Sequence, residues 1–338
     1  MMTSRERLFD RLAGKPVDRI PNLSIVMQFA ARHAGIPYGE FVSSPEKMVE
    51  GQVRTARDFG LDILTVMSDP YRETSAFGAQ IVYQHDDMPL CKSKVLTDFD
   101  RWEEQLTPFD PCKSARTAHT IRAVALFKQD YGNEYAIAGW IEGALAEFCD
   151  LSSVNDAMML LYDDPEKLNE CLEFITAQGL RYAKAQIDAG ADFIGIGDAV
   201  ASLVSEEMYA GWVMPHEMRM INEIHRLGAK VKLHICGNIN HLLPKMVLTG
   251  ADIVDIDYMV DYAYAMRLSE GKCAICGNIS PAADILEGTP ETVRRKTLAC
   301  AALSGHTGLI SSGCEVPKYS PDSNFKAIRD TLIELSDN

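Results

Sequence analysis

The order of short β-rich runs and longer helical runs is the feature that most limits how this chain can fold. Eight runs rich in β-branched residues are spaced along the 338 residues, and helical patterns lie between them. The expected strands are 22–26, 62–66, 135–138, 192–196, 230–234, 252–256, 272–276 and 307–311. Eight such alternations in this length predict an α/β fold, a single (β/α)8 TIM barrel, rather than an open doubly wound sheet.

Helical periodicity supports the same architecture. Apolar residues recur every three to four positions through 166–189, as on one face of a helix, and 206–227, 290–303 and 324–335 have similar patterns. A helix around 5–12 is expected to cap the bottom of the barrel. The stretch 83–116 fits the alternation poorly and is interpreted as an insertion after the second strand. No Pro/Gly-rich linker divides the chain, so residues 1–338 are expected to form one domain.

Charge and cysteine content limit which partners the protein is expected to bind and in which cellular compartment it is expected to lie. The chain has 33 Lys and Arg against 48 Asp and Glu, a net charge of −15, which disfavours nucleic acid and anionic membranes as partners. No window approaches 18 apolar residues, and the charged N-terminus has no apolar signal region. Nine cysteines, an odd number, indicate reduced thiols and a cytoplasmic protein, in which metal binding is favoured over a disulfide framework.

Functional residues of a (β/α)8 barrel lie at the carboxyl ends of its strands. The polar residues expected there are Asp69, Glu142, Asp198, His234, Cys236, Asp257 and Cys314. Asp69, Glu142 and Asp198 are candidate catalytic residues that would line the mouth and position a substrate or a partner. Asp198, which follows Gly195 and Gly197, two glycines that permit close backbone approach, would orient His234 or contact the substrate.

His234 and Cys236 carry the sharpest signal for chemistry. Residues two apart on a strand point to the same side, so an imidazole and a thiolate can bind one ion there. Cys314 follows the eighth strand in a loop with Gly313, and it would complete a His-Cys-Cys set with an open fourth position, the pattern of a catalytic zinc site. Asp257 would be an exchangeable fourth ligand. The alternative is a buried core histidine with two free cysteines, and Asp255 and Asp257 could equally be capping residues.

Four ordered motifs resemble a known family. GDAVAS (197–202), LHICGN (233–238), CGNISP (276–281) and SSGCEVP (311–317), with the opening SRERLFDRLAGKPVDRIP, resemble the uroporphyrinogen decarboxylase-like superfamily, and within it the methylcobamide:thiol methyltransferases. The resemblance implies a TIM barrel, Zn²⁺ held by His234, Cys236 and Cys314, a corrinoid protein that donates a methyl group from its methylcobamide, and a small thiol acceptor such as coenzyme M. It identifies no residues that bind the corrinoid.

The same comparison disfavours the decarboxylase activity itself. The RQAGR segment of the decarboxylases matches residues 28–32, where the first arginine is lost and the second remains as Arg32, although their aspartate is kept as Asp69. Their active-site tyrosine falls at Asp150 and their late histidine at Cys314. Three alternatives stay open: methyl loading from a methoxylated or methylamine-type substrate onto a corrinoid protein, uroporphyrinogen decarboxylation, and a non-catalytic zinc- or corrinoid-binding scaffold.

Overall fold

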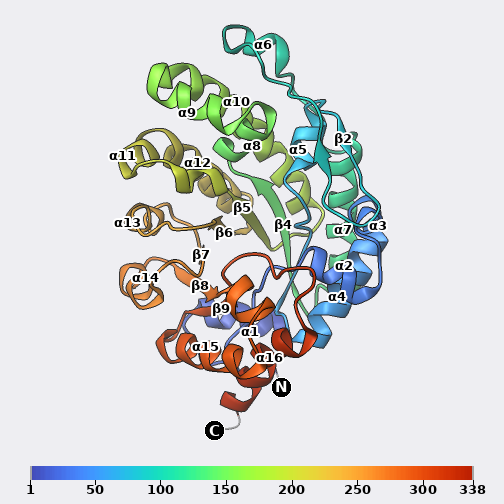
Figure 1. Cartoon of the computed structure of the whole chain (residues 1–338), viewed down its shortest axis with the longest axis vertical. Coiled ribbons are helices and arrows are strands. Elements are labelled where there is room, and N and C mark those ends of the chain that lie inside the picture. Colours follow the sequence, from blue (N-terminus) through green and yellow to red (C-terminus); the bar gives the residue numbers. More distant parts are fainter. Residues whose placement is uncertain (1, 337–338) are drawn as a thin grey trace.

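The computed structural model describes residues 2–336 and contains a curled, seven-stranded parallel sheet with helices around it (Figure 1). The strands, in sheet order, are β1 (Ile63–Thr65), β4 (Ala136–Glu142), β5 (Phe193–Gly197), β6 (Lys230–Ile235), β7 (Ile253–Ile256), β8 (Ala274–Ile279) and β9 (Leu309–Ser312). All neighbours in this order pair in parallel. Chain order and sheet order coincide, as expected when each strand is followed by a helical crossover.

Seven of the eight predicted strands are confirmed, with ends shifted by a few residues, but the prediction of a strand at 22–26 was wrong. Asn22 forms only an isolated parallel bridge with Ile310. Its segment still connects the two ends of the sheet, because Leu23 N donates to Ile310 O and Asp62 N donates to Asn22 O. Side-chain oxygens accept other backbone N–H groups there: Asn22 Oδ1 accepts from Ser24 N, and Ser24 Oγ accepts from Ser312 N.

Helices surround the sheet and connect its strands. The longer ones are α1 (Ser4–Leu12), α4 (Pro45–Phe59), α7 (Ala115–Tyr131), α8 (Ala144–Leu151), α9 (Val154–Asp163), α10 (Pro165–Asp188), α12 (Met214–Arg226), α14 (Tyr262–Ser269), α15 (Pro290–Leu303) and α16 (Asp322–Ser336). The shorter ones are α2 (Gln28–Ala34), α3 (Tyr38–Ser43), α5 (Tyr71–Ala76), α6 (Trp102–Gln105), α11 (Glu206–Met208) and α13 (Leu243–Met246). The continuous helix predicted over 206–227 is interrupted by a π-helical segment, Tyr209–Val213, between α11 and α12.

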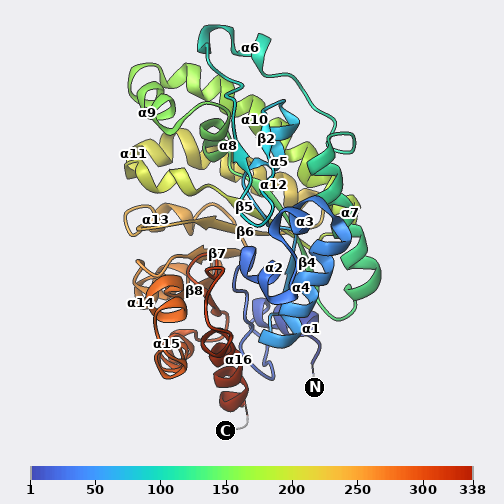
Figure 2. The same cartoon turned by 45° about the vertical axis from the view of Figure 1, so that its right-hand side comes forward.

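The region between β1 and β4 departs from simple alternation. It contains α5, a two-stranded antiparallel sheet of β2 (Ile81–Val82) and β3 (Leu90–Cys91), and α6. Figure 2 shows α6 at one end of the molecule, with both chain termini at the opposite end. No helix within residues 2–336 is both long enough and apolar enough to cross a membrane.

The core has two parts, separated by the sheet. The smaller part contains Leu8 of α1 together with strand residues such as Ile63, Phe193, Ile253 and Leu309, all at most 7% exposed. Because side chains alternate along a strand, the intervening residues, such as Val231 and Leu233 of β6, belong to the larger cluster that includes the surrounding helices. Strand residues on the same face as the smaller cluster, but nearer the carboxyl end of each strand, therefore point into the curl of the sheet.

Candidate metal centre

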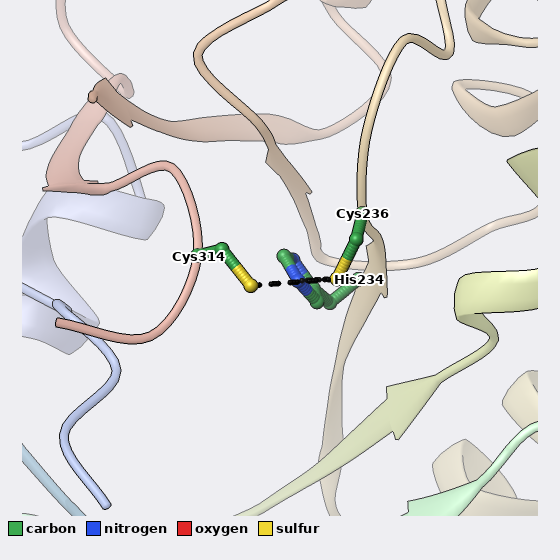
Figure 3. Close-up of side chains that lie close together, drawn as sticks. All are labelled: His234, Cys236 and Cys314. Atoms are coloured by element: carbon green, nitrogen blue, oxygen red, sulfur yellow. Dashed lines mark hydrogen bonds between the residues drawn. The ribbon is translucent and has the colours of Figure 1, made fainter. Parts of the chain in front are cut away.

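Three predicted ligands converge at the carboxyl ends of β6 and β9 (Figure 3). His234 Nε2 lies 3.0 Å from Cys236 Sγ, and Cys236 Sγ lies 3.4 Å from Cys314 Sγ. One ligand atom from each of the three residues falls within 4.8 Å of the others. Tetrahedral zinc with these donors requires ligand atoms about 3.5 Å apart, so the donor set and its spacing fit a zinc ion. Cys236 and Cys314 are partly exposed, whereas His234 is buried.

Local chain geometry explains why these residues meet. His234 belongs to β6 and Cys236 follows the strand's last residue, so the two-residue alternation carries both side chains inward. Cys314 arrives from the loop after β9, and Gly313 lets that loop pass close to the loop after β7. A Cβ atom on Gly313 would lie 2.4 Å from the backbone nitrogen of Tyr258 and 2.8 Å from Oδ1 of Asp257. The absence of a side chain at 313 therefore allows Cys314 to reach the β6 pair.

Electrostatics within the three residues favour a thiolate on Cys314. The hydrogen bond from Cys236 and the neighbouring His234 lower the pKa of the Cys314 thiol to about 4, against the effect of burial. The same hydrogen bond and burial raise the pKa of Cys236. Burial opposes the charged form of His234, but Cys236 and Asp255 raise its pKa well above the usual value. These shifts favour the thiolate form of Cys314, the thiol form of Cys236 and the protonated form of His234.

Asp257 lies beside this group but is not part of the three-residue cluster. Its Oδ2 accepts from Gly237 N at 2.8 Å and its Oδ1 accepts from Tyr258 N at 2.7 Å. Both carboxylate oxygens thus have backbone donors, and the bond from Gly237 N joins the loop after β6 to the loop after β7. The capping interpretation of Asp257 matches these contacts, and its role as a fourth ligand stays a prediction.

The residue that faces the far side of the imidazole is Asp255, not Asp198. His234 Nδ1 lies 3.0 Å from Asp255 Oδ2, and the two residues are direct partners in the β6–β7 register. Burial alone would raise the pKa of Asp255, but Lys232 and His234 outweigh that effect and lower it. The sequence contained a signal for this contact, because Asp255 precedes Asp257 by two residues and must point to the same face.

Asp198 instead caps a helix. Its Oδ1 accepts from Ala146 N at 2.9 Å, near the first turn of α8, and its contact with His234 is through the backbone, where Asp198 N donates to His234 O at 3.0 Å. Asp198 is fully buried, and this burial raises the pKa of its carboxyl to about 7. The expectation that Asp198 orients the imidazole was therefore wrong.

Asp69 and Glu142 form buried ion pairs and are not part of the three-residue cluster. Arg116 donates to Asp69 Oδ2, which also accepts from Ser68 Oγ at 2.9 Å. Arg72 Nη2 donates to Glu142 Oε1 at 2.6 Å, and both side chains are largely buried. Burial and neighbouring carboxylates raise the pKa of Glu142 well above its usual value despite Arg72. Catalytic roles for Asp69, Glu142 and Asp198 stay predictions.

Comparison with known proteins identifies the family. Uroporphyrinogen decarboxylase (URO-D) matches residues 3–335. The chain belongs to the uroporphyrinogen decarboxylase family. The resemblance inferred from the motifs is thereby confirmed.

Proteins with similar sequences include methyltransferases. A methylcobamide:CoM methyltransferase, MtbA of Methanosarcina mazei, is 27% identical over 99% of this chain and 98% of its own length. MtaA of Methanosarcina barkeri, also named a methylcobamide:CoM methyltransferase, is 25% identical over 96% of each chain. The solved structure of a methyltransferase from Methanosarcina mazei covers 99% of both chains with a TM-score of 0.91 and 22% identity. A uroporphyrinogen decarboxylase of Carboxydothermus hydrogenoformans is 22% identical over 88% of this chain and 85% of its own.

Proposed function

We propose that this protein transfers a methyl group from a methylated corrinoid, carried by a partner protein, to the sulfur of a small thiol such as coenzyme M. The single observation that carries the proposal is the convergence of His234, Cys236 and Cys314 with ligand atoms within 4.8 Å. This donor set suits zinc and provides three protein ligands, which leaves a fourth position for a substrate sulfur. The names of similar methyltransferases support the same reaction class.

Bound zinc would supply the Lewis acidity that lowers the pKa of a coordinated thiol, so that the acceptor reacts as a thiolate near neutral pH. Cys236 and Cys314 would contribute two negative charges, which keep the acceptor sulfur electron-rich. Asp255 would hold the imidazole of His234 so that Nε2 faces the two cysteines. In the transfer, the new S–C bond forms as the Co–C bond of the methylcorrinoid breaks, and the electron pair of that bond remains on cobalt as Co(I).

Three arginines with carboxylate partners, of which Arg72 and Arg116 are buried, argue against decarboxylation of a porphyrinogen. Binding several substrate carboxylates requires free guanidinium groups. Arg32, retained from the decarboxylase segment, donates to Asp322 Oδ1 at 2.5 Å, while Arg72 and Arg116 pair with Glu142 and Asp69. These arginines already have carboxylate partners within the protein, so the methyl transfer is the better-supported function.

The proposal is tested by incubating purified protein with methylcobalamin and a panel of thiols while zinc content is measured. We expect about one zinc per chain and a methylated thiol product. Cys236→Ser and Cys314→Ser should lose both zinc and methyl transfer. Cys112→Ser removes an exposed free cysteine and should retain both. Full activity of zinc-free protein would contradict the proposal.

The opposite direction of transfer is distinguished by a second incubation. Cob(I)alamin with methoxylated or methylamine-type donors should give no methylcobalamin. If methylcobalamin forms there and no thiol is methylated in the first assay, the protein loads the corrinoid instead of unloading it.

A further inference from the structure

Lys232 is a buried cation on β6, two residues nearer the amino end of the strand than the predicted ligand His234. It precedes His234 by two residues on β6, and Cys236 follows at the same interval, so the three side chains share the inward face of the strand. The Lys232 side chain is 7% exposed, and its Nζ lies 2.9 Å from Oδ2 of the fully buried Asp255. An ammonium group at such a position is costly unless it is paired, so its presence in the interior requires an explanation.

One carboxylate oxygen joins this lysine to the imidazole. Asp255 Oδ2 lies 2.9 Å from Lys232 Nζ and 3.0 Å from His234 Nδ1, while Oδ1 accepts from Ser311 Oγ at 3.2 Å. The carboxylate is thus in contact on three sides with groups from β6 and β9. On the other face of the imidazole, Nε2 is 3.0 Å from Cys236 Sγ. Lys232 is therefore linked to the Cys236 thiol through the carboxylate of Asp255 and the imidazole of His234, with each consecutive pair of atoms 2.9–3.0 Å apart.

We propose that Lys232 is a positioning residue of the metal centre, which acts by fixing the carboxylate of Asp255 and, through it, the orientation of His234. This inference rests on the proposed function in one respect, because it requires His234 to bind a metal. With Asp255 Oδ2 within 2.9 Å of Lys232 Nζ and 3.0 Å of His234 Nδ1, the carboxylate would favour a proton on Nδ1 of the imidazole when a metal is bound. The lone pair of Nε2 is then directed at the position between the two cysteines. Residues that orient a metal-bound histidine typically affect metal affinity by about 10- to 100-fold.

The same pair of strands provides a matched control. Lys230 Nζ lies 2.7 Å from Asp252 Oδ1 at the opposite, amino end of β6 and β7. This second Lys–Asp pair is of the same chemical type, with Lys230 on β6 and Asp252 immediately before β7, but its side chains are 39% and 19% exposed. Asp252 Oδ2 contacts His225, which is not one of the predicted ligands. Removing Lys230 therefore removes an ion pair without disturbing the imidazole of His234.

The test measures metal binding by the full-length protein. Zinc affinity is determined by competition with a chromophoric chelator, and the cobalt(II)-substituted protein is examined by its thiolate-to-metal and ligand-field absorption bands. Lys232→Met should bind zinc about 10-fold or more weakly and show altered cobalt bands. Lys230→Met should match the wild type in both measurements. Asp255→Asn should also weaken zinc binding. The double variant Lys232→Met/Asp255→Asn should bind zinc no more weakly than Asp255→Asn alone, because Lys232 acts through Asp255.

Lys232→Gln, which retains a hydrogen-bond donor, provides a second folded variant if Lys232→Met does not fold, and it should also weaken zinc binding. Wild-type zinc affinity and cobalt bands in either folded variant would overturn the proposal and reduce Lys232 to a structural ion pair. Wild-type zinc binding by Cys236→Ser and Cys314→Ser would instead show that the metal centre itself is wrong. The zinc measurement does not depend on methyl transfer, so a different reaction would leave this inference intact.

Discussion

Replacement of Gly313 by alanine tests whether close approach of two loops assembles the metal centre. The added Cβ would lie 2.4 Å from the backbone nitrogen of Tyr258 and 2.8 Å from Oδ1 of Asp257. The first atom belongs to the backbone and cannot rotate away. Restoring ordinary van der Waals contact requires the two loops to separate by about 1 Å.

That separation acts on the next residue, Cys314, whose sulfur lies 3.4 Å from Cys236 Sγ. Metal–ligand distances tolerate changes of only about 0.2 Å, so a shift of this size removes or weakens one ligand. We expect Gly313→Ala to bind zinc at least about 10-fold more weakly. Methyl transfer should fall by about 100-fold, as expected for a misplacement of this size at a reacting centre.

Zinc affinity is measured by chelator competition, methyl transfer from methylcobalamin by absorbance, and folding by thermal unfolding. Gly211→Ala is the matched control, because a Cβ atom there meets nothing within 4 Å and its backbone is not left-handed. Wild-type zinc affinity and activity in a folded Gly313→Ala protein would refute the reasoning. Such a result would mean that the loops absorb the alanine without moving Cys314.

Two further predictions follow from the raised and lowered pKa values. Burial raises the pKa of Asp198 to about 7, so the folded protein keeps a proton that the unfolded chain releases near its ordinary value. The free energy of unfolding should therefore fall as pH rises from about 4 to 7, by on the order of 3 kcal/mol from this group. Asp198→Asn, which keeps the oxygen that accepts from Ala146 N, should flatten this slope in urea unfolding at several pH values, and an unchanged slope would contradict the assignment. Zinc binding near pH 7 should release about two protons, one from Cys236 and one from His234, because the pKa values of both groups are raised and that of Cys314 is lowered. The number is measured by calorimetry in buffers of different ionisation enthalpy. Release of no protons would show that the three side chains are already deprotonated.

The sequence by itself determined most strands and predicted that His234, Cys236 and Cys314 would come together, as the structure shows. Hydrophobic runs and turn residues are local signals, so seven strands were predicted with small shifts of their ends. The spacing of His234 and Cys236 was sufficient to predict a shared face, because alternation along a strand depends only on position. The motifs around these residues and Cys314 were enough to identify the family that the comparison confirms.

The tertiary structure alone decided which polar groups contact one another. In the sequence, Asp198 follows a strand and Asp255 lies within one. Strand register places Asp255 beside His234, whereas the carboxylate of Asp198 accepts a hydrogen bond from Ala146 N in the first turn of α8. The 22–26 segment has strand-like composition, yet it forms only an isolated bridge, and side-chain oxygens accept some of the backbone N–H groups there. Hydrogen bonds and ion pairs act over a few ångströms between residues far apart in the chain, so these choices depend on folded geometry and not on local sequence.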